Sequence, residues 1–144
     1  MPPDEGKANR RPPEPPQPPP PPAPWPWAED DLIRIRHMLD AAEQIGAFTR
    51  SRTRDSLLED EIATLGLVKA IEIIGEAAFA LDPSVRDAID GVPWPQVIGM
   101  RHRPVHAYFD VDLAIVWATA TKAVPDLSEN LQRFLNQWEL PPRP

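Results

Sequence analysis

Cysteine is absent from the 144 residues, which excludes disulfide bonds and thiolate metal sites and removes any need for an oxidising compartment. Histidine is scarce, and His37, His102 and His106 are too unevenly spaced for a histidine-based metal centre. No run of about 18 apolar residues occurs, and prolines stand where a secretory signal would be apolar. We therefore expect no metal, no cofactor and no membrane contact, and a cytoplasmic location.

Proline divides the chain into two parts. Of the 21 prolines, 13 lie in residues 1–26, and Pro18–Pro22 is an unbroken run. Because proline fixes φ and lacks an N–H, this stretch favours polyproline II. We expect a disordered, solvated tail over residues 1–26, the alternative being a docking peptide for an aromatic-lined groove. Residues 27–140, rich in Ala, Leu, Ile and Val, suffice for one core and are predicted to form a single domain.

Positive charge is scarce in that domain, which carries 19 acidic and 11 basic residues, a net −8. Affinity for phosphates comes mainly from Lys and Arg, so the balance excludes a general nucleic-acid binder, and we expect no DNA partner. A role with RNA must rest on a local patch. One candidate is the group Arg50, Arg52 and Arg54, for which a solvated loop is an equally good explanation. The other is the segment 101–106, with two arginines and two histidines.

Apolar residues recur at helical spacing throughout the domain, and no segment alternates with the period of a strand. The spacing predicts an all-α fold, an antiparallel bundle of four to five helices behind the Pro-rich tail. The first helix should begin at Asp30 or Asp31 and stop at Gly46, before a loop over 49–56, and Pro125 should stop the fourth. The remaining helices are expected over 57–81, 95–108 with a kink at Pro104, 113–124 and 127–138, with a short turn at 85–89.

The predicted helix 57–81 has apolar residues on more than one stripe, so it should lie centrally or contact a second subunit. Glu72 and Glu76 stand one turn apart on it, among apolar neighbours. Carboxylates there are costly unless paired. They either orient an arginine across a cleft or form an ion pair at the edge of the core.

The segment 99–112 concentrates groups suited to chemistry in an otherwise acidic domain. Arg101 and His106 are five residues apart, hence about 140° apart around an ideal helix. They would share a site only through the kink at Pro104 or through a second copy of the helix across a dimer. Asp110 and Asp112 are best explained as helix caps rather than metal ligands.

The pattern R-x-x-x-x-H-x-Y, followed by Phe-Asp-Val-Asp, resembles the HEPN superfamily and, within it, the HepT-like toxin ribonucleases. Two further stretches are similar: residues 70–78 with the sequence Gly-Glu-Ala, and Val116-Trp117 with the turn at 124–127. The resemblance covers about residues 28–137. His102 departs from it, since Asn is usual there, and so does Pro104, where an aliphatic residue is usual.

The resemblance implies a homodimer that brings both motifs to one cleft and cleaves RNA without a metal. The 2′-hydroxyl of RNA would be the nucleophile, and a histidine with a pKa near 6.5 serves as acid or base near neutral pH. The resemblance also implies the roles of individual residues. They are catalysis by Arg101 and His106, binding of flanking phosphates by His102 and Arg103, and, at Tyr108, AMP addition by a cognate minimal nucleotidyltransferase antitoxin.

Two alternatives come from other functional classes. The first is a catalytically inactive helical subunit that binds the nucleotidyltransferase, a loss that His102 and Pro104 would signal. The second is a dimeric adaptor that presents the Pro-rich tail to another domain. A neighbouring nucleotidyltransferase gene would favour the ribonuclease or the inactive subunit over the adaptor.

Overall fold

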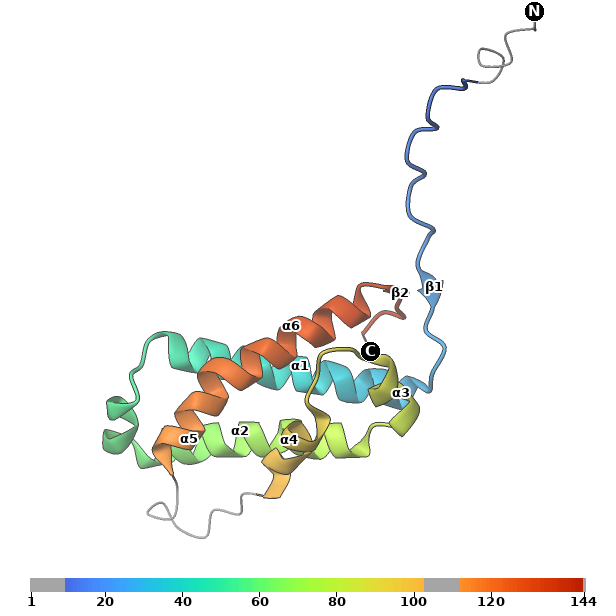
Figure 1. Ribbon diagram of the computed structural model, residues 1–144. Helices are drawn as coiled ribbons and strands as arrows, with labels where there is room; N and C mark the ends of the chain where they lie inside the picture. The colour runs from blue at the N-terminus through green and yellow to red at the C-terminus, as the bar shows by residue number, and fades with distance from the viewer. Residues whose placement is uncertain (1–9, 103–111, 144) are drawn as a thin grey trace, which may run out of the picture.

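The computed structural model describes residues 10–102 and 112–143 and confirms the all-α fold class (Figure 1). In the described part the only sheet is a pair of parallel two-residue strands, β1 (Ala23–Pro24) and β2 (Trp138–Glu139). The helices, in chain order, are α1 (Glu29–Arg50), the 3₁₀ helix η1 (Asp55–Glu59), α2 (Glu61–Ala80), α3 (Pro83–Ala88), α4 (Trp94–Gly99), the 3₁₀ helix η2 (Met100–His102), α5 (Leu113–Ala118), the π-helix η4 (Thr119–Ala123) and α6 (Val124–Leu135).

The long helix α1 lies between α2 and α6 and is antiparallel to both (Figure 1). Helix α2, for which a central place was one of two expectations, packs against α1, α4, η1 and η2. Full burial of a Leu or Ile side chain is worth about 1.5–3 kcal/mol, so the shared core holds these helices together. Its side chains with no more than 2% exposure include Leu32, Ile35 and Met38 of α1, Ile74 of α2, and Val124, Leu127 and Leu131 of α6.

Helix α1 does not stop at Gly46, as the sequence predicted, but continues to Arg50. The Thr49 Oγ1 and Arg50 Nε atoms both donate to the Gly46 carbonyl oxygen, at 3.3 and 3.0 Å. Phe48 packs on the core. These contacts outweigh the cost of about 1 kcal/mol for a glycine inside a helix.

The predicted helix 57–81 is two elements, because Asp60 begins a new helix. The Asp60 carboxylate accepts a hydrogen bond of 3.0 Å from the Ala63 N–H and so caps α2, while Leu57 belongs to η1. Thr64 Oγ1 donates to the carbonyl oxygens of Leu57 and Asp60, both at 2.9 Å. Of the predicted helix 95–108, α4 and η2 account for the part up to His102, and the rest lies outside the described residues.

Pro125 does not end the fourth helix as predicted. Asp112 caps α5, accepting from the N–H groups of Ala114 and Ile115, and the chain stays helical through η4 into α6. Pro125 occupies the first turn of α6, where its missing N–H costs little. The π-helix directly before it widens the turns against which the proline ring would otherwise press.

An aromatic cluster joins the two ends of the described chain. The rings of Trp25, Trp27, Phe134 and Trp138 lie 5.0–6.3 Å apart, mostly edge to face. Packing therefore begins at β1 and Trp25, ahead of the predicted division at residue 26, while residues 10–22 are exposed and form no helix or strand. Within the described residues, no helix combines the length and apolarity that crossing a membrane requires.

Candidate active site

The site is built where η2 crosses α2, and Gly75 makes the crossing possible. A β-carbon at position 75 would meet the backbone nitrogen of Arg101 and would stand 2.9 Å from the Met100 carbonyl carbon. Real β-carbons do not approach other atoms so closely, so only glycine permits this contact. The glycine fixes the backbone of Arg101 directly against α2.

Arg101 lies with its guanidinium on the ring of Phe79, one helical turn beyond Gly75. The guanidinium carbon is 3.4 Å from the ring centroid, the geometry of a cation–π contact. The Arg101 Nε atom is buried and has no hydrogen-bond partner in the part of the chain that the structure describes. None of the ion pairs among the described residues includes Arg101. The Arg101 cation is thus held in place, and no carboxylate among residues 10–102 and 112–143 forms an ion pair with it.

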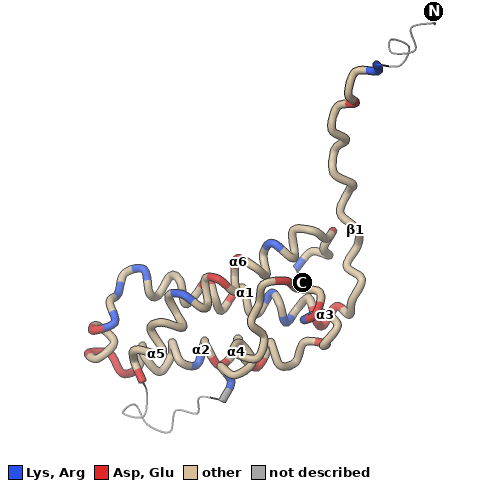
Figure 2. The backbone as a smooth tube through the Cα atoms, viewed as in Figure 1, with Lys and Arg blue, Asp and Glu red and all other residues tan. Residues whose placement is uncertain are grey.

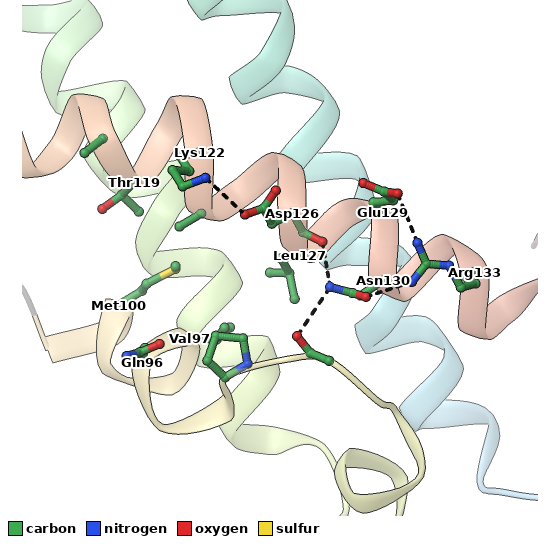
Figure 3. Close-up of a pocket in the computed structure, with 14 residues that line it drawn as sticks. Gln96, Val97, Met100, Thr119, Lys122, Asp126, Leu127, Glu129, Asn130 and Arg133 are labelled. Atoms are coloured by element: carbon green, nitrogen blue, oxygen red, sulfur yellow. Dashed lines mark hydrogen bonds and ion pairs between the residues drawn. The ribbon is translucent and has the colours of Figure 1, made fainter.

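Met100, next to Arg101 in η2, is buried at the edge of a pocket of about 590 Å³ (Figure 3). The pocket lies between α4 and the continuous helix α5–η4–α6. Its charged groups are engaged with one another, Lys122 with Asp126 at 4.0 Å and Arg133 with Glu129 at 3.0 Å. Burial of Met100 there anchors the backbone from which Arg101 reaches toward α2.

Glu72 and Glu76 do not contact Arg101 through any hydrogen bond or ion pair within the described part of the chain. Glu72, whose side chain is 18% exposed, pairs with Lys69 at 3.5 Å, and Glu76 is exposed. Their predicted role in orienting an arginine stays a prediction. The group that does hold Arg101 is Phe79, which sequence reasoning missed.

The other predicted site residues follow η2. His102 ends that helix, whereas Arg103, Pro104, His106, Tyr108 and Asp110 lie outside the described residues. In the described ranges, no three His, Asp or Glu side chains are grouped closely enough to hold a metal ion.

The second basic patch is engaged by its own surroundings. Arg52 stacks on Phe48 with its guanidinium carbon 4.0 Å from the ring centroid, and it donates to the Phe48 carbonyl oxygen at 3.1 Å. Arg54 pairs with Asp55 at 4.0 Å. Figure 2 shows acidic residues beside the basic ones at this end of the bundle. The patch is therefore engaged mainly by its own backbone and by Phe48, and within the described residues only Arg54 of the three pairs with a carboxylate.

Helix α2 exposes large apolar side chains on the side turned away from α1. Ile62 is 85% exposed, and Leu65 and Ile73 are each 40% exposed. Their spacing places the three within about 80° of one another around the helix. Lys69 and Glu76 fall in the same sector, so exposed charged side chains interrupt this apolar stripe of α2.

The comparisons with known proteins agree with the sequence pattern. The family model "Ribonuclease HepT-like" matches residues 38–134. A protein of Caldanaerobacter subterraneus named "Putative RNase TTE0752" is 30% identical over 103 residues, covering 72% of this chain and 92% of that protein. The "Probable ribonuclease HepT" of Thermococcus cleftensis is 29% identical over 100 residues, covering 69% of this chain and 91% of that protein.

A two-part relative also matches. It is the "Gamma-glutamylcyclotransferase and putative RNase MJ0434" of Methanocaldococcus jannaschii, 29% identical over 111 residues, which cover 77% of this chain. The chain spans half the length of that protein. No solved structure was found to match the chain.

Proposed function

The chain belongs to the HepT-like ribonuclease family, and on that premise we propose that it is a metal-independent endoribonuclease acting through Arg101 and His106. The observation that supports the proposal most is the state of Arg101. Its guanidinium is fixed by Phe79 and η2 and is paired with no carboxylate among the described residues. A positioned, unpaired arginine in a domain of net charge −8 is suited to hold an anion.

The reaction uses the RNA as its own nucleophile. The 2′-oxygen forms a bond to the adjacent phosphorus while the bond from phosphorus to the 5′-oxygen breaks, leaving a 2′,3′-cyclic phosphate and a 5′-hydroxyl. A base takes the proton of the 2′-hydroxyl and an acid gives one to the leaving oxygen, and His106 performs one of these transfers. Arg101 stabilises the charge on the non-bridging phosphate oxygens. His102 and Arg103 hold flanking phosphates.

The active form is a homodimer assembled through the exposed apolar stripe of α2. Burial of Ile62, Leu65 and Ile73 removes apolar area from water, worth about 25 cal/mol for each Å². Because Arg101 packs against the same helix, a dimer formed there brings two copies of the 101–106 motif toward one cleft. The composite site then needs no shared helix face between Arg101 and His106.

Regulation acts on Tyr108. A cognate minimal nucleotidyltransferase antitoxin adds AMP to the tyrosine hydroxyl, the new bond to phosphorus forming as pyrophosphate leaves ATP. The added negative charge competes with RNA phosphate for Arg101. The chain is then the cytoplasmic toxin of a two-gene pair. The alternative is a catalytically inactive subunit that binds the nucleotidyltransferase. The departures of His102 and Pro104 from the usual residues of the family favour this alternative.

The experiment that tests the reaction is incubation of the purified chain with RNA in EDTA, followed by mass spectrometry of the product ends. We expect cleavage with 2′,3′-cyclic phosphate ends, and no cleavage of an oligonucleotide in which every 2′-hydroxyl is replaced by hydrogen. Linear 3′-hydroxyl ends, or a requirement for an added divalent cation, would contradict the proposal. Absence of all cleavage, with intact binding to the nucleotidyltransferase, would favour the inactive subunit.

A further inference from the structure

Phe79 and Arg101 form a contact that the ribonuclease family's motif does not contain. Phe79 is a large aromatic residue with 53% of its surface exposed, although it stands on a helix whose other side is buried. The guanidinium of Arg101 covers its ring at 3.4 Å. Such contacts are worth about 0.5–1 kcal/mol at exposed sites and about 2 when desolvated, enough to select one orientation of a long side chain.

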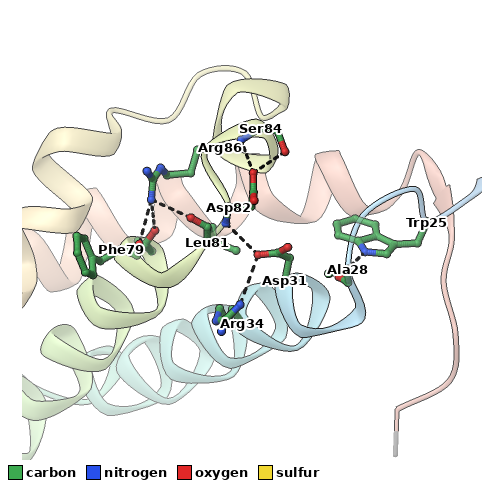
Figure 4. A network of polar contacts seen from close by, with 10 residues as sticks. Trp25, Ala28, Asp31, Arg34, Phe79, Leu81, Asp82, Ser84 and Arg86 are labelled. Carbon is green, nitrogen blue, oxygen red and sulfur yellow. Dashed lines mark hydrogen bonds and ion pairs between the residues drawn. The ribbon is translucent and has the colours of Figure 1, made fainter.

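The end of α2 that carries Phe79 is itself held firmly. The Arg86 Nη1 atom donates to the carbonyl oxygens of Ala78, Phe79 and Leu81 at 3.0, 3.1 and 3.1 Å (Figure 4). Arg86 thereby supplies a donor to carbonyl groups that the end of a helix leaves without an intrahelical partner. The neighbouring turn is tied to α1, because the Asp82 N–H donates to Asp31 Oδ1 at 3.0 Å. The Phe79 ring is therefore displayed from a rigid backbone.

The backbone of Arg101 is fixed as well, by Gly75 on one side and by the buried Met100 on the other. With both backbones fixed, the ring and the guanidinium determine each other's place. The burial of Nε, which has no partner among the described residues, determines which N–H groups of Arg101 a phosphate can reach. A phosphate cannot use a buried Nε–H, so the edge formed by Nε and one Nη nitrogen is closed. The end formed by the two Nη nitrogens remains.

From these contacts we propose that Phe79 is a positioning residue that holds Arg101 in an end-on orientation, with both Nη groups directed at the phosphate of the RNA. The inference rests on the proposed ribonuclease function, within which it assigns a role to a residue outside the R-x-x-x-x-H motif. Phe79 itself does not touch the reacting atoms. It reduces the number of orientations of the guanidinium, and so its effect falls on the rate of the step that Arg101 assists.

The first test observes the contact without RNA, by the NMR resonance of the Arg101 Nε–H group. Because the Phe79 ring shields the Arg101 Nε–H proton, we expect its signal upfield of the Nε–H signals of the other arginines. The signal is assigned by its loss in Arg101→Lys. Phe79→Leu should move the signal to the ordinary range. Phe48→Leu, which removes the cation–π pair of Phe48 with Arg52, should leave the Arg101 signal unchanged. A signal unaffected by Phe79→Leu would overturn the proposal.

The second test measures RNA cleavage by the same variants. We expect Phe79→Leu to lower kcat about 2- to 30-fold with KM changed less than twofold, and Phe79→Trp, which keeps an aromatic face, to restore kcat. In an Arg101→Lys background Phe79→Leu should lower kcat by a smaller factor, because lysine has no planar guanidinium to stack on the ring. Phe48→Leu should cleave as the wild type does. Equal kcat for Phe79→Leu and the wild type, or failure of Phe79→Trp to restore it, would overturn the positioning role.

The two tests separate the inference from the function on which it rests. If the wild-type chain shows the shielded Nε–H signal but cleaves no RNA, the contact between Phe79 and Arg101 is established. The ribonuclease function is then refuted, and with it the orientation of Arg101 toward an RNA phosphate. A chain that cleaves RNA with a kcat independent of Phe79 refutes the positioning role alone. Melting temperatures of Phe79→Leu and Phe48→Leu control for general loss of stability.

Discussion

Gly75 of α2 and Arg101 of η2 are in backbone contact, so close that a β-carbon at position 75 would stand 3.1 Å from the Arg101 Cα atom and nearer still to its nitrogen. Gly75 of the Gly-Glu-Ala stretch and Arg101, the first residue of the R-x-x-x-x-H motif, belong to separate matches in the sequence and meet in one packing contact. The glycine serves the site by the absence of a side chain.

Gly75→Ala should push η2 away from α2 and lower both stability and cleavage. Overpacking a tight contact costs about 1–3 kcal/mol, and displacement of Arg101 should reduce the cleavage rate further than the lost stability explains. Thermal unfolding and RNA cleavage of the variant measure the two effects. Gly46→Ala in α1 is the control, since an added β-carbon there meets only the end of the Arg50 side chain at 3.8 Å and alanine favours helix. A Gly75→Ala variant as stable and active as Gly46→Ala would contradict the contact.

Leu65→Lys should convert the proposed dimer into a monomer, because a desolvated lysine without a partner opposes burial of the α2 stripe. Light scattering of the wild type should give about twice the chain mass of 16.1 kDa at micromolar concentration. Gln132→Lys adds the same charge on the exposed side of α6 and should remain dimeric. A monomeric wild type would contradict both the dimer and the composite site.

Two truncations should behave differently, because packing begins at β1. Removal of residues 1–22 should change the melting temperature by less than about 1 °C, since unanchored termini contribute little. Removal of residues 1–27 deletes Trp25 and Trp27 from the aromatic cluster, where each ring pair contributes about 0.5–1.5 kcal/mol to stability. This truncation should lower the melting temperature by at least about 5 °C. Equal melting temperatures for both truncations would show that the cluster does not stabilise the domain.

Acid should release the C-terminal segment from α1. Arg143 donates two hydrogen bonds to Asp40, at 2.9 and 3.0 Å, and these hydrogen bonds hold the pKa of that carboxyl below its ordinary value. Because the folded-state pKa is lowered, the stabilising contribution is complete above about pH 3.9 and is lost as pH falls through the lowered value. NMR shifts of residues 140–143 should follow this titration, and Asp40→Asn should remove it. Shifts that titrate equally in Asp40→Asn would exclude the pair as their cause.

The sequence predicted the all-α fold and the order of the helices because apolar spacing records which faces are buried. It misplaced helix ends where tertiary contacts overrule local preference, as at Gly46, or where a π-helix admits Pro125. Asp60 before an apolar run was a readable cap signal. The pairing of Phe79 with Arg101 had no local signal, because the two residues are 22 positions apart and meet only through the crossing of η2 and α2.

The measurement that tests the central claim most directly is the cleavage rate of one RNA in EDTA by the wild type, Arg101→Ala, His106→Ala and the double variant. If the two residues serve one transition state, each single substitution should abolish cleavage, and the double variant should be no slower than either. Helicity and oligomeric state should match the wild type in all three variants. Cleavage by His106→Ala at the wild-type rate, or losses that multiply in the double variant, would contradict the assignment.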